Sequence, residues 1–150
     1  MPPRPSQLPP IGLRLTQTSR VAAAAFEAVL AAAGGSAPLW QVLLLVRSRE
    51  WGNQSLMAEA MGVTSATLTH HLNAAERQGL VRRWREPDNR RVQRVELTDE
   101  GATMFDRLRS VAVEHDERLR ALFSEQELQS FADYLDRVRV ELSGGGDRQS

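Results

Sequence analysis

The fold is decided by residues 57–101, which read MAEAMGVTSATLTHHLNAAERQGLVRRWREPDNRRVQRVELTDEG. Near the start of this stretch, Gly62 ends a short amphipathic helix, and Thr64 can cap a second helix over 65–78 that stops at Gly79. Two short helices joined by so tight a turn are typical of a helix-turn-helix, whose second helix enters the major groove of DNA. The stretch therefore predicts a DNA-binding head.

The helix over 65–78 has two contrasting faces when its residues are placed about 100° apart. Its apolar face is formed by Leu68, Leu72 and Ala75. The opposite, outward face carries Ala66, His70, Asn73 and Arg77, with Ser65, Thr67 and Thr69 on its flanks. Because this face has no bulky apolar residue, and its side chains are short near the start of the helix, it suits close approach to a groove.

After this helix the hydrophobic pattern changes from helical to alternating, which indicates two strands over 80–85 and 92–97. The residues between them read Glu-Pro-Asp-Asn-Arg-Arg, in which Asn89 is a turn residue. Arg90 and Arg91 should therefore lie at or beside a protruding tip. A hairpin directly after a recognition helix is a wing.

Longer helices are predicted on both sides of the head. Apolar residues recur at helical spacing from Ile11 to the glycines at 34 and 35, and Ser36 can cap a mostly apolar, central helix. After the hairpin, Thr98 caps a helix with an acidic first turn, and Ser124 opens the capping box of the last helix. The predicted fold class is mostly α, an α+β winged helix with a two-stranded wing and long terminal helices.

The outer helices are longer than the small head could cover, which predicts a dimer interface. The apolar residues assigned to it are Ile11, Leu15, Leu119, Leu128, Phe131, Leu135 and Val138. The predicted domains are a disordered tail over 1–10, a dimerisation helix over 11–35, a winged head over 36–98, dimerisation helices over 99–143 and a disordered tail over 144–150. A helical bundle within one chain is the alternative.

Charge is unevenly distributed along the chain, although the net charge is +0. All 19 basic side chains are arginine, and seven of them lie from Arg77 to Arg94, with only Glu86 and Asp88 as acids between these two. From Thr98 onward, acids outnumber arginines. One region is thus suited to a polyanion such as DNA; a solvated charged face is the alternative.

Several function classes are disfavoured. The absence of cysteine removes thiolate metal sites, cysteine nucleophiles and thiol redox sensing, and no apolar run approaches the roughly 18 residues of a membrane span. The sequence has no nucleophile with a base, no paired carboxylates in an apolar setting and no glycine-rich phosphate loop. His70 and His71 point about 100° apart on a helix and cannot easily share an ion. We therefore expect a soluble, cytoplasmic protein that is not an enzyme, with no cofactor, metal or membrane partner.

The order of these parts over residues 11–142 resembles the multiple antibiotic resistance regulator (MarR) family. The strings that carry the resemblance are LMAEAMGVT, ATLT, ERQGLVRR, DNRR and VELTDEG. A helix-turn-helix alone is a weak signal. Followed at close range by Gly-Leu-Val, an Asp-x-Arg wing and Leu-Thr-x-x-Gly, it is specific.

The resemblance implies a homodimer that places two recognition helices in successive major grooves of a pseudo-palindromic operator, about 34 Å apart. It further implies a transcriptional regulator, commonly a repressor, that releases DNA when a small aromatic or anionic molecule binds between the head and the dimerisation helices. An architectural or protein-interaction winged helix without ligand control is the alternative.

Carried onto this sequence, the resemblance implies base or phosphate contacts from the serine and threonines of the recognition helix, an arginine of the wing in the minor groove, and an aspartate that orients this arginine. The candidate helix contacts are Ser65, Thr67, Thr69, His70, Asn73 and Arg77, and the candidate wing contacts are Arg83, Arg85, Asp88, Arg90 and Arg91. His70 stands where many relatives have arginine, so the base preference at that position stays open.

Trp40 and His115 are candidates for the ligand pocket, because Trp40 lies on the central helix and His115 on an apolar stripe. The alternatives are a buried structural tryptophan and a satisfied interface histidine. Trp84 has two interpretations as well: it stacks on a sugar or guanidinium group, or it anchors the wing to the head.

Overall fold

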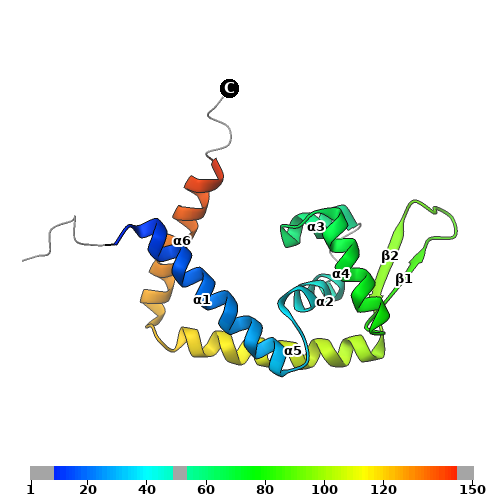
Figure 1. The fold of residues 1–150 in the computed structure, drawn as a ribbon, viewed down its shortest axis with the longest axis horizontal. Helices are drawn as coiled ribbons and strands as arrows, with labels where there is room; N and C mark the ends of the chain where they lie inside the picture. The colour runs from blue at the N-terminus through cyan, green and yellow to red at the C-terminus, as the bar shows by residue number, and fades with distance from the viewer. Residues whose placement is uncertain (1–8, 49–53, 145–150) are drawn as a thin grey trace, which may run out of the picture. The chain divides into compact units, whose positions relative to one another are not determined.

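A computed structural model describes residues 9–48 and 54–144 of the chain. Its elements, in order, are α1 (Ile11–Ala32), α2 (Ala37–Ser48), α3 (Gln54–Met61), α4 (Ser65–Arg77), β1 (Val81–Arg85), β2 (Gln93–Leu97), α5 (Asp99–Arg120) and α6 (Glu125–Ser143) (Figure 1). The predicted class, mostly helical with one two-stranded wing, is confirmed. Most of the two predicted tails lies outside the described residues.

The chain divides into two compact units, Met1–Ala112 and Val113–Ser150, and α5 continues from the first into the second. The predicted head over 36–98 lies wholly within the first unit. The assignment of residues 11–35 and 99–143 to dimerisation stays a prediction.

The core of the first unit is built around α2, as its apolar sequence predicts. Val42 and Leu43 of α2 are fully buried, and α2 contacts α1, α4 and β2. The inward face of α4 is buried as predicted, and the other elements contribute Leu30, Met57, Ala58, Leu80, Val81, Phe105 and Leu108 to the same cluster. Each fully buried side chain of this kind stabilises the fold by about 1.5–3 kcal/mol relative to an exposed one.

Two glycines end the helices of the helix-turn-helix. Gly62 has a φ of 67° after α3 and Gly79 a φ of 73° after α4, a region that favours glycine because it has no Cβ. At the start of α4, the Thr64 hydroxyl accepts a hydrogen bond from the backbone N–H of Thr67 at 3.2 Å. The predicted cap is therefore confirmed. Thr64 sets the start of the recognition helix, and Gly79 sets its end.

The base of the hairpin is tied to the first turn of α5. The Thr98 hydroxyl donates to the carbonyl of Gly79 at 2.5 Å and accepts from the N–H of Gly101 at 3.0 Å, while the N–H of Thr98 donates to the carbonyl of Leu80 at 3.1 Å. A Cβ built on Gly101 would lie 1.9 Å from the carbonyl oxygen of Leu80. Glycine is therefore required where α5 meets the chain entering β1.

The hairpin is antiparallel, with Val81 opposite Leu97 and Arg85 opposite Gln93, and each strand is one residue shorter than predicted. Figure 1 shows it beside α4, with its turn at the end remote from α5. Val81, Val95 and Leu97 belong to the core or pack against it. Because side chains alternate along a strand, Arg82 and Trp84 of β1 and Arg94 and Glu96 of β2 lie on the opposite, outward side.

The second unit contains the end of α5 and the whole of α6. The predicted capping box is present: Ser124 accepts from the N–H of Glu127 at 3.2 Å, and Glu127 accepts from the N–H of Ser124 at 2.8 Å. The rings of Phe123 and Phe131 stack with their centroids 5.5 Å apart. A hydrogen bond to Asp116, together with its charge, raises the pKa of the Arg120 guanidinium.

Large apolar side chains of this unit are exposed in the single chain. Leu119 is 46% exposed, Phe131 45% and Leu135 41%, and these residues line a groove of about 680 Å³ between the end of α5 and α6. Within the described part of the chain, no single helix is long and apolar enough to cross a membrane; α1 and α2 together have the length and composition but meet at 76°.

Candidate nucleic-acid interface

The outward face of α4 is accessible, as the helical pattern predicts. Of the predicted helix contacts, Ser65, Thr67, Thr69, His70 and Arg77 are exposed, and Asn73 is half-buried. The Thr69 hydroxyl donates to the carbonyl of Ser65 at 2.9 Å, which leaves its oxygen lone pairs for an incoming donor. The His70 and His71 rings lie 5.8 Å apart and are tilted by 58°. These residues offer small hydrogen-bonding groups at the start of the helix and a cation at its end.

The arginine cluster divides into paired and unpaired side chains. Three arginines are held by carboxylates: Arg82 by Glu96 on the opposite strand, Arg83 by Glu76 at 2.5 Å, and Arg94 by Glu86 at 2.6 Å. Arg85 donates to the carbonyl of Arg90 at 2.7 Å. The side chains of Arg77, Arg90 and Arg91 have no ion-pair partner among the described residues. They are the cations of the head most available to phosphate.

The wing tip is organised by Asn89 and Arg85. The Asn89 side-chain oxygen accepts from the backbone N–H of Arg91 at 3.2 Å, forming an Asx turn. Within the described hairpin, no ion pair joins Asp88 to Arg90 in the DNA-free chain, and the orienting role of this carboxylate stays a prediction. The Asn89 amide and the Arg85 guanidinium hold the backbone of the turn, and Arg90 is exposed.

Arg83 is the predicted wing contact that the structure places differently. Its side chain is only 15% exposed, and it turns toward α4, where it also donates to the side-chain oxygen of Asn73. The alternation along β1 explains this position, because Arg83 is two residues from the buried Val81 and so lies on the same side of the strand. Arg83 and Asn73 are therefore hydrogen-bonded to each other in the DNA-free chain.

Trp84 does not anchor the wing to the head. It is 37% exposed and lies opposite Arg94 on the outward side of the hairpin, with the Arg82 guanidinium 5.3 Å from its ring centroid. Of the two interpretations of Trp84, stacking on a guanidinium is the one that the structure contains.

The predicted ligand residues lie in different units, Trp40 in the first and His115 in the second. Trp40 is half-buried and stacks on Phe105 with 5.4 Å between ring centroids, while the Arg47 guanidinium lies 5.4 Å from the same Phe105 ring. Trp40 therefore makes a structural contact within the first unit, and the ligand-pocket role of Trp40 and His115 stays a prediction.

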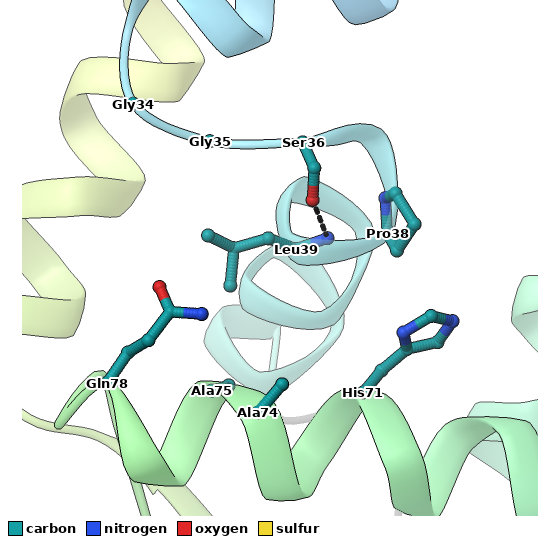
Figure 2. A pocket seen from close by; sticks show the side chains of 9 residues that line it. All are labelled: Gly34, Gly35, Ser36, Pro38, Leu39, His71, Ala74, Ala75 and Gln78. Carbon is teal, nitrogen blue, oxygen red and sulfur yellow. Dashed lines mark hydrogen bonds between the residues drawn. The ribbon is translucent and has the colours of Figure 1, made fainter.

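A pocket of about 390 Å³ opens elsewhere in the first unit, between the turn joining α1 to α2 and the inner side of α4 (Figure 2). His71 of α4 and Gln78, the residue that follows α4, point toward this space, and at its far wall the Ser36 hydroxyl accepts from the N–H of Leu39 at 3.2 Å. The remaining lining residues are small or apolar: Gly34, Gly35, Pro38, Leu39, Ala74 and Ala75. The pocket combines apolar lining residues with three side chains that can form hydrogen bonds, Ser36, His71 and Gln78.

Sequence reasoning missed four residues of these sites: Glu76, Asn89, His71 and Gln78. Glu76 lies about one helical turn after Asn73, on the same side of α4. This spacing is a sequence signal that one side chain can contact both residues. Asn89 was identified as a turn residue, but its bond to the Arg91 N–H was not inferred. His71 and Gln78 were not assigned to a pocket, because the α1–α2 turn that forms the opposite wall is remote in sequence.

Comparison with known proteins gives consistent matches. Residues 36–92 match the model of the MarR family. The chain is 28% identical over 130 residues to the uncharacterised HTH-type transcriptional regulator YdgJ of Bacillus subtilis, which covers 87% of this chain and 77% of that protein. It is 32% identical over 88 residues to the HTH-type transcriptional regulator PecS of Dickeya dadantii, which covers 59% of this chain and 53% of that protein.

Solved structures match over most of the chain. The transcriptional repressor CouR bound to a 23-mer DNA duplex has a TM-score of 0.77 and 26% identity, covering 89% of this chain and 94% of that one. CouR from Rhodococcus jostii RHA1 bound to p-coumaroyl-CoA has a TM-score of 0.72 and 23% identity, covering 85% and 90%, and this second likeness shows the fold.

Proposed function

Because this chain belongs to the MarR family of DNA-binding transcriptional regulators and is not an enzyme, we propose that it acts in the cytoplasm as a homodimeric repressor. Two copies bind a pseudo-palindromic operator, and a small ligand releases them. The observation that carries the DNA-binding step is the pairing pattern of the arginines. Arg77 of the recognition helix and Arg90 and Arg91 of the wing tip have guanidiniums with no carboxylate partner in the part of the chain that the structure describes.

The two surfaces have different tasks on the duplex. The exposed hydroxyl and imidazole groups of α4 offer donors and acceptors to base edges in a major groove, which carry sequence information. The exposed Arg90 at the tip suits a narrow minor groove, whose negative potential attracts guanidinium. The similarity to CouR, whose structure contains a DNA duplex, supports this arrangement.

Dimerisation is supported by the exposed apolar side chains of α5 and α6. Monomeric proteins rarely leave large contiguous apolar patches in water, and such patches mark protein interfaces. A closed pair of identical chains would match the two-fold symmetry of an inverted-repeat operator.

Ligand control is supported by the pocket between the α1–α2 turn and α4. A planar molecule held there would contact both the turn and the inner side of the recognition helix. For this to release DNA, the ligand must bind the DNA-free conformation more tightly than the DNA-bound one. The CouR complex with p-coumaroyl-CoA shows that one structural neighbour binds a small organic molecule.

The decisive experiment is selection of bound sequences from random duplexes by the purified full chain. An inverted repeat whose half-sites are about one helical turn apart is expected, with a preference of about a thousandfold or more over random duplex. Binding without any sequence preference would instead indicate an architectural winged helix.

The first variant to measure is Arg90→Ala. Loss of a desolvated guanidinium contact is expected to weaken operator binding by about tenfold or more, and to reduce the slope of log affinity against log salt by about one. Arg109→Ala, which removes the same charge from an exposed site on α5, is the control and should bind as the natural chain does. Unchanged affinity of Arg90→Ala at moderate salt would remove the wing from the mechanism.

A further inference from the structure

We propose that Arg83 is a positioning residue: by joining β1 to Asn73 and Glu76 of α4, it fixes the direction of the wing relative to the recognition helix. The proposal rests on the proposed DNA-binding function. Arg83 would act through the tip arginines, and would not itself be a phosphate contact.

The burial of Arg83 distinguishes it from its neighbour in the same strand. The Arg83 side chain is 15% exposed, whereas that of Arg82 is 69% exposed. A guanidinium with so little contact with water needs its donors satisfied, since an unpaired charge is unfavourable away from water. Its Nε donates to Glu76 Oε2 at 2.5 Å, and its Nη2 donates to Asn73 Oδ1.

The two partners make the contact directional. Asn73 and Glu76 are three residues apart and therefore neighbours on the surface of α4. A planar guanidinium that bonds two groups through different nitrogens is fixed in both position and plane. A lysine at this position could satisfy the charge of Glu76 but could not reproduce the fork.

Strand β2 also contacts the helix-turn-helix, through a separate hydrogen bond. Gln54, at the start of α3, hydrogen-bonds through its side chain to the side chain of Gln93 on β2. Because Gln93 pairs with Arg85 in the ladder, this second contact lies near the tip end of the strands. The hairpin is thereby connected to both helices of the DNA-binding motif, in addition to its tie to α5.

Replacing Glu76 tests the proposal, because the two possible roles of its carboxylate predict opposite changes in DNA affinity. Its side chain is 45% exposed and lies on the helix that approaches the phosphates. A carboxylate there repels DNA, so a Glu76→Gln change acting only through charge would strengthen binding. If Glu76 instead holds Arg83, and Arg83 holds the wing, the same change weakens binding.

The experiment measures operator affinity of the full chain by fluorescence anisotropy, using a duplex chosen by the selection described above. Glu76→Gln and Arg83→Lys are expected to weaken binding by at least about threefold, while Arg82→Ala, which removes a wing charge without touching α4, changes it less. In an Arg90→Ala background, the cost of Arg83→Lys should largely disappear, because the contact that it positions is already lost.

Thermal unfolding of each variant identifies any that fail to fold, and Arg83→Lys keeps the positive charge for this reason. Tighter binding by Glu76→Gln, full affinity of Arg83→Lys, or additive costs of Arg83→Lys and Arg90→Ala would each overturn the positioning role. If the natural chain bound no duplex at low salt, the proposed function itself would fail. If the natural chain bound the duplex, and the affinity of each variant changed only as its change in charge predicts, the positioning role of Arg83 would fail and the proposed function would stand.

Discussion

At the scale of single residues, Gly101 is the described glycine at which an added Cβ would meet the nearest atom. A methyl group at this position would lie 1.9 Å from the Leu80 carbonyl oxygen, a backbone atom that also accepts a hydrogen bond from Thr98. Because backbone atoms cannot turn aside as a side chain would, we expect Gly101→Ala to lower the free energy of unfolding by about 2–3 kcal/mol. Urea denaturation followed by circular dichroism measures this change.

Gly12→Ala is the matched control for that prediction. Gly12 lies in the first turn of α1, and a Cβ there would meet no described atom within 4 Å. Replacing an unconstrained helical glycine by alanine should leave stability unchanged or raise it by up to about 1 kcal/mol. Equal midpoints for the two variants would show that α5 can move away from Leu80 without cost.

The arginines show what a sequence can and cannot indicate about a site. The cluster from Arg77 to Arg94 correctly identifies the strongly basic region, because charge is a property of the residue itself. Which members are paired depends on where the chain brings the carboxylates. Glu76 reaches Arg83 only because the hairpin folds back along α4, and a one-dimensional count of charges contains no such information.

At the scale of elements, the caps determine where helices begin. Thr64 caps α4 through a 3.2 Å bond to the N–H of Thr67. We expect Thr64→Ala to reduce the free energy of unfolding by about 1 kcal/mol and Thr64→Ser to keep most of it, because serine retains the hydroxyl. Chemical denaturation of both variants checks the difference. If alanine and serine gave the same stability, the hydroxyl would not be the source of the cap.

Element positions were predicted well, since their signals are local. Caps, glycines and hydrophobic periods place every described helix, and the strands differ by one residue each. The side-chain contacts between elements were not predicted. Trp40 stacks on Phe105 across more than sixty positions of sequence, and such pairs are set by how helices pack.

At the scale of the whole molecule, the expected assembly is a dimer formed through apolar side chains such as Leu135. This residue is 41% exposed in the single chain and lines the groove of the second unit. A glutamate there would bring an unpaired charge into an apolar interface, so Leu135→Glu should convert the dimer to a monomer. Analytical ultracentrifugation measures the mass, and operator affinity should fall with it because one head contacts one half-site.

Gln126→Glu is the control for this substitution, because it adds the same charge to the exposed first turn of α6. It should remain dimeric. If Leu135→Glu kept the mass of a dimer, the dimer interface would have to lie on other surfaces, and the groove would not be part of it.

The hairpin has a chemical property that bears on how the protein can be made to release DNA. Its cations are all guanidiniums: Arg82, Arg83, Arg85, Arg90, Arg91 and Arg94. Guanidinium keeps its proton at every pH a cell reaches, and it is not the amine that acetyltransferases neutralise on lysine. Discharging the wing is therefore not an available switch. A ligand that releases DNA, as proposed above, would therefore act on the position or accessibility of these charges and not on their ionisation.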